Sequence, residues 1–138
     1  MGPEITIIEF GLNDCSCDGH SVKNRVSIEE YRANLKALAK IVHGRGGQPI
    51  LVANHLPMYS NEPPQPDGQL YSTKVAAYNA IVRELAQEMD LALIDAEAHF
   101  AAPEYTSQKL RADGLHLNLE GNHVYARALY AALRPFAD

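Results

Sequence analysis

The run Ile5-Thr6-Ile7-Ile8-Glu9-Phe10, followed by Gly11-Leu12-Asn13-Asp14, decides the fold class of this chain. A near-continuous series of β-branched and apolar residues is typical of a strand that is covered on both faces, as in parallel sheets. Gly, Asn and Asp form turns, so we expect the strand to end at Gly11. Asn13 then follows the carboxyl end of a strand, where open α/β sheets bind their ligands.

Outward from this run, the chain alternates between helix-like and strand-like segments. Strands that are separated by helices must lie parallel in one sheet, with a crossover between each pair. The sequence therefore predicts an α/β domain that spans residues 1–138. The expected elements are a helix capped by Ser27, a strand over 50–53, a long Pro-rich loop over 55–71, a helix capped by Thr73, a strand over 91–94 and a last helix that is capped by Asn118 and ends before Pro135.

Composition excludes several function classes. The 138 residues are 46% hydrophobic and 21% charged, with a net charge of −5, which is ordinary for one globular domain. No Lys/Arg run is present, so we expect no nucleic-acid partner. No apolar stretch approaches the ~20 residues of a membrane span, so we expect no membrane partner. No basic segment leads into an apolar run at the start, so no secretion signal is predicted and we expect a cytoplasmic protein.

The stretch Ala112-Asp113-Gly114-Leu115-His116 holds an Asp and a His three residues apart, just before the last predicted helix. At this spacing the two side chains can meet on one side of a short turn. The carboxylate can then fix the imidazole tautomer and stabilise the imidazolium, as in a catalytic triad. The simpler alternative is a turn whose Asp and His only cap the helix that follows.

Together, Gly11-Leu12-Asn13-Asp14 and Asp113-Gly114-Leu115-His116 resemble two signature blocks of the SGNH (GDSL-type) ester hydrolases, Gly-x-Asn-Asp and Asp-x-x-His, in the family's order. The resemblance implies a flavodoxin-like, three-layer parallel sheet, here truncated to about three strands that correspond to the family's third to fifth. It also implies that His116 is the general base, Asp113 its partner and Asn13 a donor in the oxyanion hole. Gly11 and His55 are the candidate substrate-binding residues.

The family's Gly-Asp-Ser block, which carries the nucleophile, does not occur in this sequence, and neither does its second block. Three explanations are open. In the first, a residue of the loop after Asn13 replaces the missing serine, with Ser16 ahead of Cys15 and Cys17, and with Ser60 and Ser72 as more distant candidates. In the second, the missing segment comes from another chain. In the third, the chain is an inactive remnant.

We therefore expect hydrolysis of short-acyl carboxylic esters through an acyl-enzyme, with a small ester as the partner molecule. The alternative is an inactive binding or assembly module. No cofactor is implied, and no metal, because Cys15-x-Cys17-x-x-His20 lacks a second ligand cluster. A disulfide between Cys15 and Cys17 would be strained. Without the family's first strands the run at Ile5 becomes a sheet edge, which predicts a homo-oligomer.

Overall fold

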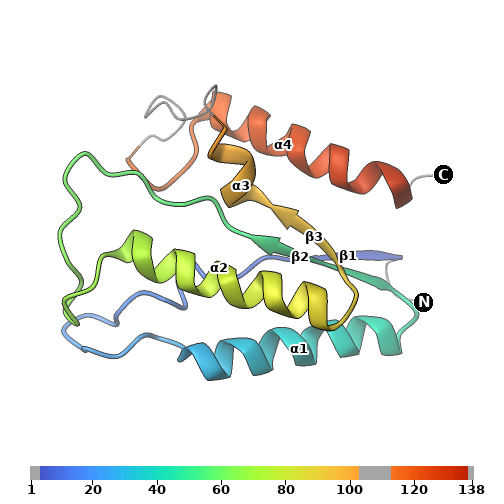
Figure 1. The fold of residues 1–138 in the computed structure, drawn as a ribbon, viewed down its shortest axis with the longest axis horizontal. Coiled ribbons are helices and arrows are strands. Elements are labelled where there is room, and N and C mark those ends of the chain that lie inside the picture. Colours follow the sequence, from blue (N-terminus) through green and yellow to red (C-terminus); the bar gives the residue numbers. More distant parts are fainter. Residues whose placement is uncertain (1–3, 103–112, 137–138) are drawn as a thin grey trace.

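A three-stranded parallel sheet with the strand order β1-β2-β3 organises the computed structural model, which describes residues 4–102 and 113–136 (Figure 1). Ile7 of the first strand lies opposite Ile50 of the second, so the register is fixed by apolar residues. The predicted α/β class is confirmed. The strands are β1 (Ile5–Ile8), β2 (Gln48–Ala53) and β3 (Ala92–Asp95).

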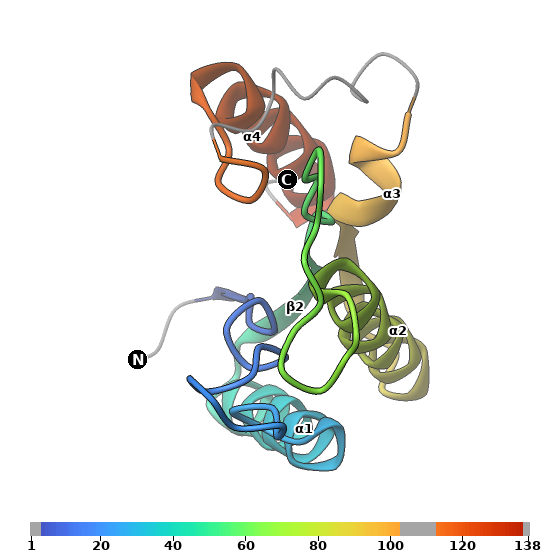
Figure 2. The same cartoon turned by 90° about the vertical axis from the view of Figure 1, so that its left-hand side faces the viewer.

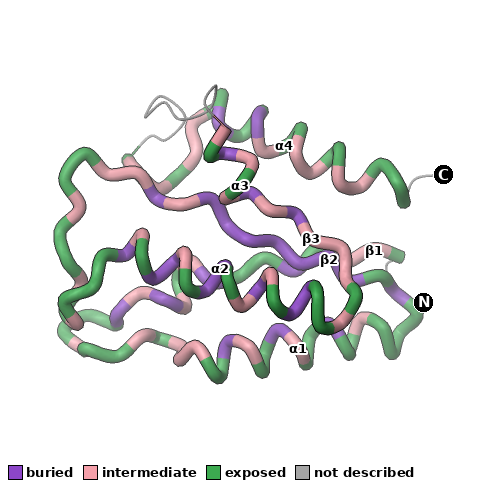
Figure 3. Tube along the Cα trace, viewed as in Figure 1, coloured by how far each residue is buried: buried purple, intermediate pink, exposed green. Residues whose placement is uncertain are grey.

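Helices cover both faces of the sheet (Figures 1 and 2). Leu51 and Ala53 of β2 belong to the core cluster beneath the first two helices, whereas Ile50 and Val52 pack against the last one. Successive side chains of a strand point to opposite faces, so a strand covered on both faces needs consecutive apolar residues, and β2 is buried from Pro49 to Ala53 (Figure 3). The helices are α1 (Ile28–Gly44) and α2 (Tyr71–Glu88) on one face, and α3 (Ala96–Phe100), α4 (Leu119–Leu133) and the 3-10 turn η3 (Arg134–Phe136) on the other.

Two of the three predicted helix caps are confirmed. Ser27 forms a complete capping box with Glu30, and the Asn118 side chain accepts a hydrogen bond from the Gly121 N–H. The prediction that Thr73 caps α2 is wrong, because this helix begins two residues earlier, at Tyr71. The carboxylate of Glu62, ten residues upstream, accepts hydrogen bonds from the Ser72 N–H (2.7 Å) and hydroxyl (2.6 Å) and so satisfies the first turn.

Strand β1 lies at the edge of the sheet and is less covered than its sequence predicts. It ends at Ile8, two residues before Phe10, and within the described residues it pairs only with β2. Ile7 is 40% exposed and Phe10 is 54% exposed. The expectation of a strand covered on both faces is therefore wrong, because α4 packs over the middle of the sheet and leaves this margin open.

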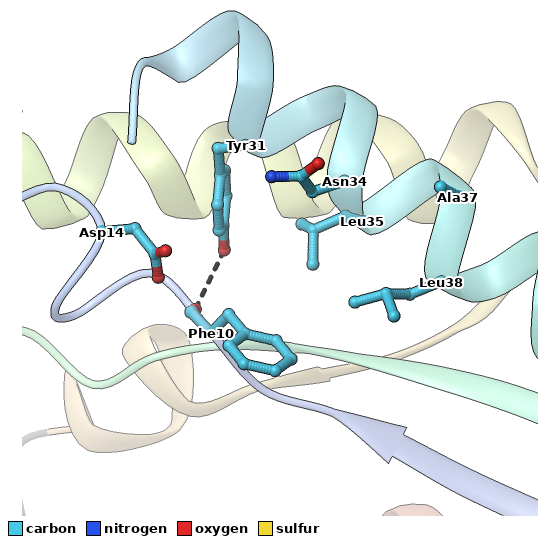
Figure 4. Close-up of a pocket in the computed structure, with 7 residues that line it drawn as sticks. All are labelled: Phe10, Asp14, Tyr31, Asn34, Leu35, Ala37 and Leu38. Atoms are coloured by element: carbon cyan, nitrogen blue, oxygen red, sulfur yellow. Dashed lines mark hydrogen bonds between the residues drawn. The ribbon is translucent and has the colours of Figure 1, made fainter. Parts of the chain in front are cut away.

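A cavity of about 350 Å³ lies between the end of β1 and helix α1, next to this open margin (Figure 4). The Tyr31 hydroxyl donates a hydrogen bond to the Phe10 carbonyl oxygen at 2.9 Å and closes one end of the cavity. Leu35 and Leu38 of α1 line its wall. The apolar lining therefore continues the exposed margin of the sheet onto the neighbouring helix.

Within residues 4–102 and 113–136, no helix is long and apolar enough to cross a membrane. In the same two ranges, no group of three or more His, Cys, Asp or Glu side chains is placed to hold a metal ion.

Candidate active site

Asp113 and His116 form a hydrogen-bonded pair at the turn that leads into α4. The His116 Nδ1 lies 2.7 Å from Asp113 Oδ2, and Asp113 Oδ1 accepts the backbone N–H groups of Leu115 (2.9 Å) and His116 (2.7 Å). The hydrogen bond from the His116 ring and those from the two backbone amides hold the pKa of Asp113 well below its usual range. An ionised carboxylate requires the proton on Nδ1, so Nε2 is left free to accept a proton, as a general base must.

The first residues of the Pro-rich loop hold this turn in place. The Met58 N–H donates to the Gly114 carbonyl oxygen at 2.6 Å, and the His55 Nε2–H donates to the Leu115 carbonyl oxygen at 2.8 Å. Gly114 has a φ of +87°, and a Cβ at this residue would lie 2.6 Å from Cδ1 of Tyr59. The turn therefore requires glycine both for its backbone conformation and for the close approach of the Tyr59 ring.

Asn13 lies in a loop that is fixed on both sides. The Gly11 N–H donates to Asp14 Oδ2 at 2.8 Å, so Asp14 closes the turn around Asn13. The Tyr71 hydroxyl donates to the Leu12 carbonyl oxygen at 2.6 Å and ties the loop to the start of α2. Gly11 has a φ of +121°, and a Cβ there would meet the Tyr31 hydroxyl at 2.9 Å. We conclude that these hydrogen bonds of the neighbouring residues fix the backbone conformation at Asn13.

Three of the residues singled out in the sequence line one cavity of about 360 Å³, namely Asn13, His55 and His116. They come from the loops after β1 and β2 and from the turn before α4, so the carboxyl end of the sheet brings them together. The cavity is open on the side of His116, whose side chain is 76% exposed, and Asp113, with a side chain 56% exposed, is not part of its lining. Gly11 lines a neighbouring cavity of about 530 Å³, which Asn13 also borders.

The candidate nucleophiles do not line the cavity that holds His116. The Ser16 hydroxyl donates to the Asn13 carbonyl oxygen at 2.8 Å. Cys15 is fully buried, and burial raises the pKa of its thiol to about 12. Cys17 contacts Lys74, and the Ser72 hydroxyl is bound to Glu62. Ser16 therefore stays a prediction, and it would have to exchange its local hydrogen bond to serve as nucleophile.

Three of the residues that position the two halves of the site were not given this role from the sequence. Gly114, Met58 and Tyr71 act through backbone hydrogen bonds and a close van der Waals contact, which leave little trace in a sequence. The one available signal was the glycine inside Asp113-Gly114-Leu115-His116, because a glycine within a functional turn often indicates a positive φ. Met58 and Tyr71 carried no comparable signal.

The comparison with known protein families agrees with the parallel sheet and with the geometry of this site. The sequence profile of the GDSL-like Lipase/Acylhydrolase family matches residues 1–124, and the chain belongs to this family. No curated protein matches the chain significantly.

Solved structures show the same fold at low sequence identity. A lipase/acylhydrolase from Enterococcus faecalis is 24% identical, with a TM-score of 0.72 over 96% of this chain and 62% of its own. A GDSL-like lipase from Bacteroides thetaiotaomicron is 17% identical, with a TM-score of 0.75 over 96% and 63%. A catalytic mutant of an acetylxylan esterase from Geobacillus stearothermophilus is 20% identical, with a TM-score of 0.73 over 95% and 59%. The chain thus spans about 60% of the length of these relatives.

Proposed function

We propose that this chain provides the general base and an oxyanion-hole donor for the hydrolysis of short-acyl carboxylic esters. The observation that carries the proposal is the Asp113–His116 pair, whose histidine lines the same cavity as Asn13. Membership of a family of acylhydrolases supports the reaction class. A cavity of about 360 Å³ suits a small acyl group better than a long chain.

In the proposed reaction, His116 Nε2 takes the proton of a hydroxyl nucleophile while the nucleophile attacks the ester carbonyl carbon. The carboxylate of Asp113 stabilises the imidazolium that results. The side-chain amide of Asn13 donates a hydrogen bond to the developing oxyanion. His116 then returns the proton to the leaving alcohol, and water hydrolyses the acyl-enzyme by the same steps in reverse order.

Two sources of the nucleophile are proposed. Ser16 lies three residues after Asn13, in the same loop, and has to give up its hydrogen bond to the Asn13 carbonyl oxygen to turn towards the site. A second polypeptide could instead pair with the free edge of β1 and place a hydroxyl near Asn13, because the apolar side chains of Ile7 and Phe10 are exposed along that edge. A second copy of this chain on that edge would make a homo-oligomer.

The test measures hydrolysis of p-nitrophenyl acetate by the parent chain, by His116→Ala and by His43→Ala. His43 is an exposed histidine in the last turn of α1, so it controls for ester cleavage by any surface imidazole. We expect a loss of roughly 10²–10⁴-fold in kcat for His116→Ala and none for His43→Ala. Equal activity in all three proteins would remove His116 from the mechanism.

A fluorophosphonate that reacts with activated serines identifies the nucleophile. Labelling of Ser16 that is lost in Ser16→Ala supports the local source. Labelling of a different chain, or activity that appears only after a second protein is added, supports donation across the β1 edge. A parent chain that neither hydrolyses esters nor takes up the label would favour the inactive module instead.

A further inference from the structure

A buried cluster of Lys74, Cys17 and Asp67 lies outside the proposed active site. Lys74, in the first turn of α2, is 3% exposed, and its Nζ donates to Cys17 Sγ at 3.2 Å and to Asp67 Oδ2 at 2.7 Å. Burial by itself lowers the pKa of Lys74, but the hydrogen bonds to Asp67 and Cys17 outweigh it and raise the pKa. The same hydrogen bond from Lys74 lowers the pKa of Asp67. An ammonium group is therefore kept in contact with a thiol.

Cys17 is held in this position by its own backbone. Its N–H donates to Gln65 Oε1 at 3.1 Å, and the residue forms an isolated antiparallel bridge with Asn24. The loop after β1 meets here the end of the Pro-rich loop and the start of α2, which lie 48 and 57 residues further along the chain (Figure 2). The distance between the sulfur and the nitrogen is thus set by the tertiary fold.

Cys15 provides a contrast inside the same loop. Its sulfur is completely buried and lies 3.5 Å from the Leu12 carbonyl oxygen, and burial raises the pKa of this thiol by more than the charge of Lys74 lowers it. Of the two sulfurs, that of Cys17 has the Lys74 nitrogen at hydrogen-bond distance, where an amine can trap a sulfur that has been oxidised. The two cysteines should therefore differ in reactivity although they are two residues apart.

We propose that Cys17 and Lys74 form a redox modification site, at which hydrogen peroxide as oxidant leads to a sulfur–nitrogen bond between the two side chains. Lys74 and Asp67 line a cleft of about 530 Å³ that admits a small oxidant to these two side chains, whereas Cys17 is 8% exposed and is not part of its lining. The separation of 3.2 Å between sulfur and nitrogen is within the range at which two atoms are poised to react.

The Cys17 sulfur attacks one oxygen of the peroxide, the O–O bond breaks, and the other oxygen leaves as water with the thiol proton, which gives a sulfenic acid. Lys74 Nζ gives up one proton to the solvent of the cleft that it lines, and the free amine then attacks the sulfur. The S–N bond forms, the S–O bond breaks, and the hydroxyl leaves as a second water with a proton from the nitrogen. Sulfur loses two electrons and the peroxide is reduced to two waters.

The bond would tie the loop that carries Asn13 to the helix that carries Tyr71, across 57 residues of sequence. A cross-link of this length constrains the unfolded chain, so the oxidised protein should have a higher Tm than the reduced protein. This inference does not depend on ester hydrolysis, since its readouts are a covalent bond and thermal stability.

The experiment treats the folded full chain with a small excess of hydrogen peroxide, quenches with catalase and maps the peptides by mass spectrometry without reduction. We expect the peptides of Cys17 and Lys74 to be joined, lighter by two hydrogen atoms than their sum, and separated again by dithiothreitol. Cys15→Ser should retain the cross-link. Cys17→Ser and Lys74→Arg should lose it, and so should the parent chain when it is oxidised in urea.

Several results obtained with the parent chain alone would overturn the proposal. These are a disulfide between Cys15 and Cys17, equal oxidation of both thiols, Cys17 oxidised without a bond to Lys74, or a chain that peroxide leaves unchanged. A joined pair that retains one oxygen atom would refute the sulfur–nitrogen bond. A cross-link that also forms in urea would refute the role of the fold.

Discussion

Replacing Gly114 with alanine tests whether the Asp113–His116 turn depends on its contact with the Pro-rich loop. The added Cβ would lie 2.6 Å from Cδ1 of Tyr59 and 3.0 Å from the Met58 carbonyl oxygen. The ring of Tyr59 can shift, but the Met58 carbonyl is backbone, and Met58 itself donates to the Gly114 carbonyl oxygen. The substitution therefore pushes apart two segments that the native structure joins.

Gly68→Ala is the matched control for this change. Gly68 has a φ of +80°, close to the +87° of Gly114, and a Cβ there would meet nothing within 4 Å. A non-glycine residue in this backbone region costs about 1–2 kcal/mol in either variant. Only Gly114→Ala adds a steric clash, and overpacking typically costs a further 1–3 kcal/mol. We expect Gly114→Ala to destabilise the turn by about 1–3 kcal/mol more than Gly68→Ala.

Urea unfolding gives the free energy of each variant, and the NMR shifts of the His116 ring report whether the turn keeps its geometry. We expect Gly114→Ala to lower the free energy of unfolding more than the control does and to displace the His116 signals towards those of a histidine without the hydrogen bond to Asp113. If the two variants lose equal stability and the His116 signals do not move, the loop does not position the turn and the reasoning fails.

Three further predictions follow from the structure. The pKa of Asp113 is lowered in the folded chain, so its carboxylate stabilises the fold above a pH of about 3.8, and this stability is lost as the pH falls from there through the folded pKa. Urea unfolding at several pH values should therefore show that Asp113→Asn is less stable than the parent above this pH window and equally stable below it. Asn79→Ala removes the hydrogen bonds to the backbone N–H and carbonyl groups of the buried Asn54, and it should lower the free energy of unfolding in urea by about 2–4 kcal/mol. The control Asn34→Ala, at an exposed residue, should lower it by less than about 0.5 kcal/mol, and equal losses would contradict the role of the Asn79–Asn54 hydrogen bonds. The chain should self-associate through the edge of β1 in sedimentation at micromolar concentration, and Ile7→Lys should weaken the association, whereas a parent chain that stays monomeric would refute it.

The sequence by itself determined the features that depend on neighbours along the chain. The alternation of apolar runs and helical periodicities indicated a parallel sheet, and β2 is buried on both faces as its apolar run required. The caps at Ser27 and Asn118, and the hydrogen bond between Asp113 and His116, each join residues three apart. Spacing of this kind is readable because the backbone conformation of a turn brings such residues together wherever the turn lies.

Tertiary structure alone decided the contacts that cross the sheet and the loops. Helix α2 starts at Tyr71 because Glu62 reaches its first turn, and Lys74 meets Cys17 across 57 residues. The exposure of Ile7 depends on where α4 packs, not on its own strand. The path of the whole chain brings such groups together, and their pairing becomes favourable only once the core around them is buried. The local sequence therefore carries no pattern from which these contacts could be read.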